Sequence, residues 1–457
     1  MNINQAAATI ALPTTGWRAH TALAVPLATQ QVGLQLMGAV DVAMLGHYSA
    51  DALAGAGVAN ALIFTITCVG MGVMMGMDSI APKAIGEGDP MTAHRSLFGA
   101  TRLALWVGLG CMIAVIASPQ LLALTHVDEG VAREARVFVY ARAIGVVPFL
   151  LSVALRCYLA AFGRTRALLL ATIAGNLVNA LLDYFLIYGV DSLGLPPLGV
   201  LGAAIATSSV QIVTLLVYVG AARKLLATAT ARVVATTADV RAIAAFGIPI
   251  GGQMLAEVGV FALAGVLAAN ISGVAAGAHN VAITLASFSF SLAIGIGAAT
   301  STQVGYAFGA GNPLGVRRAG KIGLTLGGVV MAVCALVFVV VPEPLVALFT
   351  NDSAVRAATI PLLRIAAIFQ LSDGAQAIVG GALRGLGDTR ATLIANLIGH
   401  YGVGLGVALT LAFGFDLGVA GLWWGLSAGL TVTAIALYIR FVNMSNQLPG
   451  ASTGTDS

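Results

Sequence analysis

Twelve apolar runs, each long enough to cross a lipid bilayer, constrain the fold of this chain most. A spanning helix needs about 20 mostly apolar residues. Runs of this length lie at residues 18–46, 52–77, 96–122, 138–161, 168–189, 199–222, 243–270, 277–305, 320–348, 358–382, 390–414 and 418–442. They are too long and too continuous for the alternating strands of a membrane β-barrel. We therefore predict an all-α polytopic membrane protein with twelve transmembrane helices.

The composition excludes a soluble protein. Only 9% of the 457 residues are charged, whereas a soluble domain carries about 25%. The net charge of +4 is spread over the loops and does not form the clustered basic face that nucleic acid binding requires. We therefore expect the lipid bilayer, and no nucleic acid, as a partner.

The placement of Lys and Arg predicts the orientation, because cytoplasmic loops carry an excess of these residues. The loops after the even-numbered runs, the adjoining helix ends and the two termini hold seventeen of the 22 Lys and Arg residues. The opposite face holds the other five: Arg133, Arg136, Arg142, Arg356 and Arg364. We expect both termini to be cytoplasmic, with the chain in the cytoplasmic (inner) membrane of a bacterium.

An internal repeat relates the two halves of the chain. An offset of 223 residues superposes the same residue type at widely separated positions: Pro26 and Pro249, Gln30 and Gln253, Gly72 and Gly295, Gly86 and Gly309, Arg95 and Arg318. Each half has six predicted helices, so both halves begin on the same side as parallel repeats. Two such pseudo-symmetric six-helix lobes around a cleft are the usual architecture for alternating access.

The repeat also predicts the domain boundaries. We expect an N-terminal lobe at 1–222, a cytoplasmic inter-lobe linker at 223–242, a C-terminal lobe at 243–442 and a disordered tail at 443–457. Pro26 and Pro249 lie inside equivalent helices, where proline removes a backbone hydrogen bond and kinks the helix. We expect hinges at both prolines, with static kinks as the alternative.

Four acidic residues lie within predicted spans: Asp41, Asp183, Glu257 and Asp373. An ionised group at mid-bilayer costs at least ~2.5–3.5 kcal/mol on insertion scales, so such residues usually face a cavity and serve function. The alternative is that each acid has only a structural role and makes a buried hydrogen bond. Their repeat partners are Ala264, Val407, Leu34 and Phe149. The scaffold is duplicated and the acids are not, which favours a division of labour between the lobes.

In the N-terminal lobe, Asp41 and Asp183 lie at similar depths, roughly 7–9 Å below the predicted outer boundary. Asn179 is one turn before Asp183 on the same helix face, and Thr207 lies roughly 12 Å down the next helix. This set of oxygen groups suits Na⁺, or protons shared between coupled carboxyls.

In the C-terminal lobe, Glu257 and Asp373 lie in the middle of their helices. Gln370, Asp373 and Gln376 repeat every third residue and form a polar stripe. This stripe is interpreted as a cavity wall, with interhelical hydrogen bonding as the alternative. We expect four glutamines to line a substrate cavity: Gln30, Gln253, Gln370 and Gln376.

Other polar and aromatic positions have simpler interpretations. Asp78, near Lys83 at a cytoplasmic helix end, is expected to be solvated, and Trp423 and Trp424 are typical of interfacial anchors. The sequence contains no nucleophile–base pair, no HExxH and no GxxxxGK[ST] loop. We therefore expect no enzyme activity, no cofactor, and transport driven by an ion gradient.

These features together resemble the multidrug and toxin extrusion (MATE) transporters, and their NorM-like branch in particular. The resemblance rests on VDVAMLGHYS at 40–49, the NxxxD of Asn179 and Asp183, Glu257, and the LSDGAQ…LRGLGDTR run at 371–390. It covers residues from about 20 to 442. The resemblance implies an antiporter that exports cationic lipophilic drugs or toxins in exchange for Na⁺ or H⁺.

By position, the resemblance assigns Asp41, Asn179, Asp183 and Thr207 to an N-lobe cation and proton site. It assigns Glu257 and Asp373 to a C-lobe cation site, and Na⁺ is a candidate ligand at either acid pair. NorM-like proteins often have Asn where this chain has Asp183, so the coupling ion stays open. The alternative is a flippase or exporter of an endogenous metabolite or lipid-linked precursor, whose cavity for an anion should be basic. We expect organic cations as substrates, and a monomer.

Overall fold

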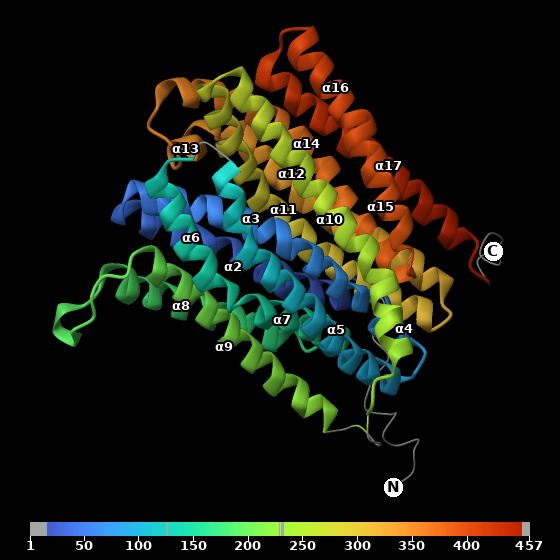
Figure 1. Cartoon of the computed structure of the whole chain (residues 1–457). Coiled ribbons are helices and arrows are strands. Elements are labelled where there is room, and N and C mark those ends of the chain that lie inside the picture. The colour runs from blue at the N-terminus through green and yellow to red at the C-terminus, as the bar shows by residue number, and fades with distance from the viewer. Residues whose placement is uncertain (1–15, 125–126, 228, 230–232, 450–457) are drawn as a thin grey trace. The chain divides into compact units, whose positions relative to one another are not determined.

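The structure, a computed structural model, describes residues 16–124, 127–227, 229 and 233–449 (Figure 1). Within these residues, ten helices are long and apolar enough to cross a membrane, and a bent pair adds an eleventh span. The helix α2 (Trp17–Tyr48) has 32 residues, but Gln30, Gln31 and Gln35 lower its hydropathy. With α2 included, the helices match the twelve predicted runs, which confirms an all-α polytopic membrane protein.

The other long helices are α3 (Ala50–Met74), α5 (Pro90–Ala117), α8 (Thr165–Tyr188), α9 (Val200–Leu226), α10 (Thr237–Ile271), α11 (Gly273–Gly309), α12 (Pro313–Val340), α14 (Ser353–Leu386) and α17 (Gly418–Asn446). The shorter helices are α4 (Ala81–Gly86), α6 (Glu129–Ala143), α7 (Val146–Ala161), α13 (Pro342–Ala347), α15 (Thr389–Leu397) and α16 (Leu405–Leu409). Figure 1 shows α8 and α9 side by side, joined by the loop at 189–199.

The predicted span 138–161 was wrong at its beginning. The chain forms α6 and α7, which meet at a 51° bend around Ile144 and Gly145. α6 begins at Glu129, where Asp128 Oδ1 accepts a hydrogen bond from the Gly130 amide at 2.8 Å. The charged residues of this amphipathic helix made it look like a loop in the sequence. Arg142, which we placed on the outer face, therefore lies in the last turn of α6, inside the broken span.

Two other predicted spans contain irregular helical turns. After α3 the chain tightens into a 3₁₀ helix at Met75–Ser79, before α4. The span 390–414 contains two π-helical segments, Ile398–Gly404 and Thr410–Gly414, on either side of α16. The π-helical turns pack against α17 through small residues, because a Cβ at Gly399 or Gly404 would touch the backbone of Gly429.

The helices belong to two compact units. The first unit contains the residues up to Ala28, Asp78–Asp89 and the chain from Gly252; the second contains Thr29–Met77 and Pro90–Gly251. α2 and α10 each divide between the units two residues after their proline, Pro26 or Pro249. The predicted division into lobes at 1–222 and 243–442 and a linker at 223–242 places these segments differently. It stays a prediction from the repeat.

Two glycines related by the repeat allow neighbouring helices to approach closely the helices that divide between the units. A Cβ at Gly295 of α11 would overlap the backbone of Ala28 in the first unit, and a Cβ at Gly72 of α3 would overlap Gly251 in the second. The repeat offset of 223 residues separates Gly72 from Gly295, and it also separates Ala28 from Gly251. The same backbone contact therefore occurs once in each unit.

Three smaller predictions change. Asp78 is only 4% exposed in the 3₁₀ helix, so the expected solvated position was wrong. Trp423 is fully buried, and only Trp424, at 40% exposed, fits an interfacial anchor. Residues 443–446, which were predicted to begin a disordered tail, form the end of α17. Residues 450–457 lie outside the described part of the chain.

Candidate functional site

The four intramembrane acids are withdrawn from the surface. Asp41, Asp183 and Asp373 are buried and Glu257 is half-buried. Asp41 and Asp183 belong to the second unit, whereas Glu257 and Asp373 belong to the first. Each unit therefore contains its own pair of acids, and each pair is the centre of a separate acidic site.

Asp41 of α2 is the centre of the acidic site in the second unit. Thr207 Oγ1 of α9 donates a hydrogen bond to Asp41 Oδ2 at 2.9 Å. Asp183 and Asn179, which follow one another by a turn on α8, lie close enough to interact electrostatically with Asp41. The structure thus brings together all four residues that the sequence placed at compatible depths.

Several polar atoms of this site make no hydrogen bond in the described chain, although their side chains lie close to one another. Both carboxyl oxygens of Asp183, both amide atoms of Asn179 and Oδ1 of Asp41 are buried without a hydrogen bond in the described chain. A buried polar group without a partner costs ~1–3 kcal/mol, and nearly all such groups in native proteins are satisfied. Protons or a small cation would satisfy the carboxyl and amide oxygens. The residues present therefore fit Na⁺ or H⁺.

Arg142 is a member of this site that sequence reasoning missed. Its guanidinium interacts electrostatically with Asp41, and its Nε is buried without a hydrogen bond among the described residues. The signal was present in the sequence, because Ala135, Phe138 and Arg142 share one face of a helix. It was missed because the span was predicted to begin only at residue 138, so that Arg142 was counted with the basic residues at the outer end of the span.

Glu257 of α10 is the centre of the site in the first unit. Its Oε1 accepts a hydrogen bond from Gln253 Nε2 at 3.0 Å, and a second from Gln376 Nε2 of α14. Gln376 Nε2 also donates to Asn396 Oδ1 of α15 at 3.1 Å. Two of the glutamines predicted to line a cavity therefore hold a carboxylate.

Asn396 and His400 extend this network beyond the predicted residues. His400 Nε2 lies 3.1 Å from Asn396 Oδ1, while Asn396 Nδ2 donates to the Thr392 carbonyl at 2.9 Å. Because Asn396 Oδ1 can only accept, His400 Nε2 is the donor. His400 lies in a π-helical segment, a feature frequent at functional sites. The i,i+4 spacing of Asn396 and His400 was a signal that sequence reasoning did not use.

The polar stripe of α14 is buried along its length. Asp373 lies within electrostatic range of Glu257, and Glu257 in turn is within range of Arg384. Gln370 is fully buried, and neither its amide oxygen nor its amide nitrogen has a hydrogen bond in the described chain. The stripe thus combines one hydrogen-bonding residue, Gln376, with a buried carboxyl group and with a glutamine whose amide makes no hydrogen bond in the described chain.

Gln30 has a different environment from its repeat partner Gln253. Its Nε2 donates to the Tyr218 hydroxyl at 2.9 Å, and its Oε1 is buried without a partner among the described residues. Pro26 and Pro249 lie inside continuous helices, as expected. A hinge at either proline and a substrate cavity at the glutamines stay predictions.

No described group of three or more His, Cys, Asp and Glu residues is arranged to hold a metal ion. Na⁺ at either site would therefore depend on two carboxylates together with amide or hydroxyl oxygens. Such oxygen ligands are those that hard cations prefer.

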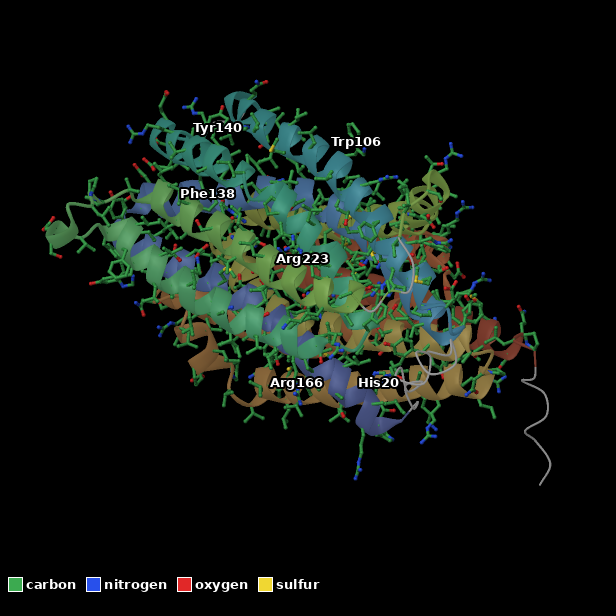
Figure 2. All side chains as sticks on the ribbon, turned by 90° about the horizontal axis from the view of Figure 1, so that it is seen from below. His20, Trp106, Phe138, Tyr140, Arg166 and Arg223 are labelled. Atoms are coloured by element: carbon green, nitrogen blue, oxygen red, sulfur yellow. The ribbon has the colours of Figure 1, made fainter. Side chains whose placement is uncertain are left out.

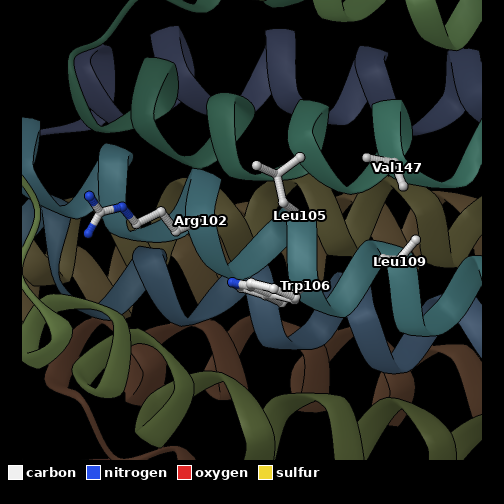
Figure 3. A pocket seen from close by; sticks show the side chains of 5 residues that line it. All are labelled: Arg102, Leu105, Trp106, Leu109 and Val147. Carbon is white, nitrogen blue, oxygen red and sulfur yellow. The ribbon is translucent and has the colours of Figure 1, made fainter.

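Two hollows on the surface of the second unit contain none of the four acids. One, of about 400 Å³, is lined by Arg102, Leu105, Trp106, Leu109 and Val147 (Figure 3). The other, of about 270 Å³, lies along α5, α7 and α9. Trp106, labelled in Figure 2, is 72% exposed. These apolar hollows do not form the acidic sites.

Gln376 can be tested as the support of Glu257. Gln376→Met keeps the side-chain length and removes a donor from Glu257, which leaves the half-buried carboxylate less satisfied. We expect a loss of ~1–3 kcal/mol, measured as a lower melting temperature in detergent. Gln31→Met is the matched control, because Gln31 is half-buried and has no described hydrogen bond. Equal melting temperatures for the two variants would contradict the role of Gln376.

Comparison with known proteins gives matches over nearly the whole chain. The family model described as MatE matches residues 26–185 and 249–410, two segments that begin at the repeat-related prolines. A probable multidrug resistance protein NorM from Bradyrhizobium diazoefficiens is 36% identical over 442 residues, which cover 94% of this chain and 93% of that protein.

Two solved structures share the fold. One is the eukaryotic MATE transporter AtDTX14, with a TM-score of 0.85, 21% identity, and 93% of this chain and 94% of that chain covered. The other is a MOP superfamily transporter from Pyrococcus furiosus, described as having a binding pocket of reverse polarity that suggests a different function. It has a TM-score of 0.87 and 19% identity, with 96% of this chain and 97% of that chain covered.

Proposed function

Because the chain belongs to the MatE family of MATE transporters, we propose that it is a secondary antiporter that exports cationic, lipophilic drugs or toxins in exchange for Na⁺ or H⁺. Membership in the family makes the chain a multi-pass membrane transporter and not an enzyme. The observation that carries the proposal is the group of buried, unpartnered oxygens at Asp41, Asp183 and Asn179. Such a group needs a positive ligand.

The carboxylates perform the exchange by competition. When the site is open to the outside, Na⁺ or H⁺ neutralises Asp41 and Asp183. A bound organic cation then loses its counter-charge and leaves. When the site is open to the cytoplasm, the ion is released and a new organic cation binds. A ligand shifts an equilibrium only by its difference in affinity between the two states, and this competition supplies that difference.

The two acidic sites have different surroundings, which supports the predicted division of labour. Asp41 Oδ1 and both carboxyl oxygens of Asp183 have no hydrogen bond in the described chain, whereas Glu257 Oε1 accepts hydrogen bonds from two glutamines. We therefore assign ion exchange principally to Asp41 and Asp183, with Glu257 and Asp373 as a second cation site. The prolines Pro26 and Pro249 act as hinges, and Gln30 and Gln370 line the substrate cavity.

Cationic substrates follow from the charge of the sites. The described intramembrane positions include four carboxylates, two in each unit, and the relatives are named for multidrug resistance.

The chain functions as a monomer in the bacterial inner membrane, with both termini in the cytoplasm as the distribution of Lys and Arg predicts. A cysteine that replaces the exposed Pro449 should be labelled by an impermeant reagent only after the cells are opened.

Transport by the purified protein tests the coupling ion. The protein is reconstituted into proteoliposomes, and uptake of ethidium is followed under an imposed Na⁺ gradient or an imposed pH gradient, one at a time. We expect one gradient to drive accumulation of the dye well above protein-free vesicles. No accumulation under either gradient would contradict the antiport proposal.

The alternative, export of an endogenous anionic metabolite or lipid-linked precursor by the same fold, is supported by one observation on this chain and one on a structural neighbour. Arg142 brings a positive charge into the Asp41 site, and one structural neighbour is described as having a pocket of reverse polarity. Growth of a drug-sensitive strain separates the two functions. Resistance to ethidium conferred by the gene supports drug export, whereas an unchanged sensitivity supports the alternative.

A further inference from the structure

Arg142 lies on the buried face of α6. Ala135, Phe138 and Val139 on that face are at most 1% exposed, and Arg142 follows Phe138 by one helical turn. Tyr140, two residues after Phe138 on the same helix, is 50% exposed (both are labelled in Figure 2). Arg142 is thirteen residues from the start of α6 at Glu129, or roughly 20 Å along the helix. It lies in the last turn of α6, just before the bend of the broken span.

The bend between α6 and α7 positions Arg142 beside α9. Gly145, at the bend, lies against Ser208: a Cβ on Gly145 would be 3.3 Å from Ser208 Cα and 3.3 Å from Arg142 Nη1. Ser208 Oγ donates to the Ala141 carbonyl at 3.2 Å, and the preceding residue, Thr207, donates to Asp41. Two consecutive residues of α9 therefore connect the arginine turn with the acidic site.

Arg142 and Asp41 attract one another without forming an ion pair. No carboxylate of the described chain lies within ion-pair distance of Arg142, yet Arg142 and Asp41 interact electrostatically. A half-buried arginine that served only to neutralise one acid would be expected in direct, hydrogen-bonded contact with it. Asp41 Oδ1 and both carboxyl oxygens of Asp183 therefore have no direct bond to the guanidinium, nor any other hydrogen bond in the described chain.

We propose that Arg142 is a tethered counter-charge that weakens cation binding at Asp41 and Asp183, so that the bound ion or drug can be released. This inference rests on the proposed role of these two acids. With two carboxylates and one guanidinium, the ion-free site carries one net negative charge and is matched by one monovalent cation. Without Arg142, the empty site would hold two uncompensated charges in the membrane, a state that is costly.

The role of Arg142 is that of a positioning charge, and it predicts tighter cation binding when the arginine is lost. A merely structural arginine would do the opposite, because its loss would disturb the site and weaken binding. In a protein of effective dielectric constant ~20, a unit charge about 12 Å away changes cation affinity by roughly tenfold, and a nearer one by more. The sign of the change therefore separates the two explanations.

The test is the equilibrium binding of ethidium to the full-length protein purified in detergent, measured by fluorescence anisotropy. Arg142→Gln is expected to bind the dye roughly tenfold more tightly and, in proteoliposomes, to release it more slowly. Arg142→Lys keeps the charge and is expected to bind the dye close to wild type. Unchanged or weaker binding by folded Arg142→Gln overturns the inference.

Arg136→Gln is the matched control, because Arg136 lies on the same helix with its side chain 45% exposed. Its binding is expected to equal that of wild type. If Arg142→Gln does not fold, Arg142→Met replaces it, since an apolar side chain of similar length avoids a buried unpaired polar group. Asp41→Asn separates the two proposals: efflux that survives Asp41→Asn refutes the acid site itself. Lost efflux in Asp41→Asn, with wild-type dye binding in Arg142→Gln, refutes only the counter-charge.

Discussion

Asp41→Asn is expected to abolish ion-driven efflux of ethidium while leaving the protein folded. Asparagine has the size of aspartate, and its carbonyl oxygen can still accept the hydrogen bond that Thr207 Oγ1 donates to Asp41 Oδ2. Only the charge is lost. Neither an inward ion nor an outward organic cation would then meet a carboxylate at this position, so their competition ends. Efflux from proteoliposomes should fall to the level of protein-free vesicles.

Folding of the Asp41→Asn variant is checked by size-exclusion chromatography and by its melting temperature. Removing a buried charge relieves an expensive desolvation, so we expect a melting temperature at or above that of wild type. Asp191→Asn is the matched control, because Asp191 is exposed in the loop between α8 and α9. Its efflux should be that of wild type. Normal efflux from Asp41→Asn would contradict the proposal that this acid is required for the exchange.

Gly72→Ala is expected to destabilise the protein strongly. A Cβ at Gly72 would overlap the backbone of Gly251, and backbone cannot rotate away as a side chain can. Overpacking of this kind typically costs ~1–3 kcal/mol, occasionally more. The intrinsic preference of helices for Ala over Gly acts in the opposite direction by up to ~1 kcal/mol, so the steric cost should prevail. The measurement is the melting temperature in detergent, together with the yield of monodisperse protein.

Two further variants make the glycine prediction specific. Gly295→Ala should destabilise as Gly72→Ala does, because it creates the repeat-related overlap with Ala28. Gly57→Ala, also on α3, should be neutral or slightly stabilising, since a Cβ there meets nothing within 4 Å. Similar melting temperatures for Gly72→Ala and Gly57→Ala would show that the close approach of α3 and α10 does not contribute to stability.

Most helices could be predicted because each crosses the bilayer as an independent apolar run. α6 was the exception: its buried stripe of Ala135, Phe138 and Val139 alternates with exposed charges, so hydropathy alone did not identify it. The bend at Gly145 and the π-helical turns near His400 were also beyond prediction. They depend on close packing against α9 and α17, which involves residues far away in the sequence.

The sequence by itself determined the membrane class, the repeat and the four acids, since the bilayer penalises charge and unpaired backbone wherever they occur. It also determined that Asp41, Asn179, Asp183 and Thr207 have compatible depths, because helical rise is fixed. Only the tertiary structure decided which other side chains reach the acids. Helix rotation and bending brought Arg142 towards Asp41 and joined Glu257 to Gln376, Asn396 and His400. Those contacts depend on how helices that are distant in the sequence pack against one another, and the local sequence does not encode this packing.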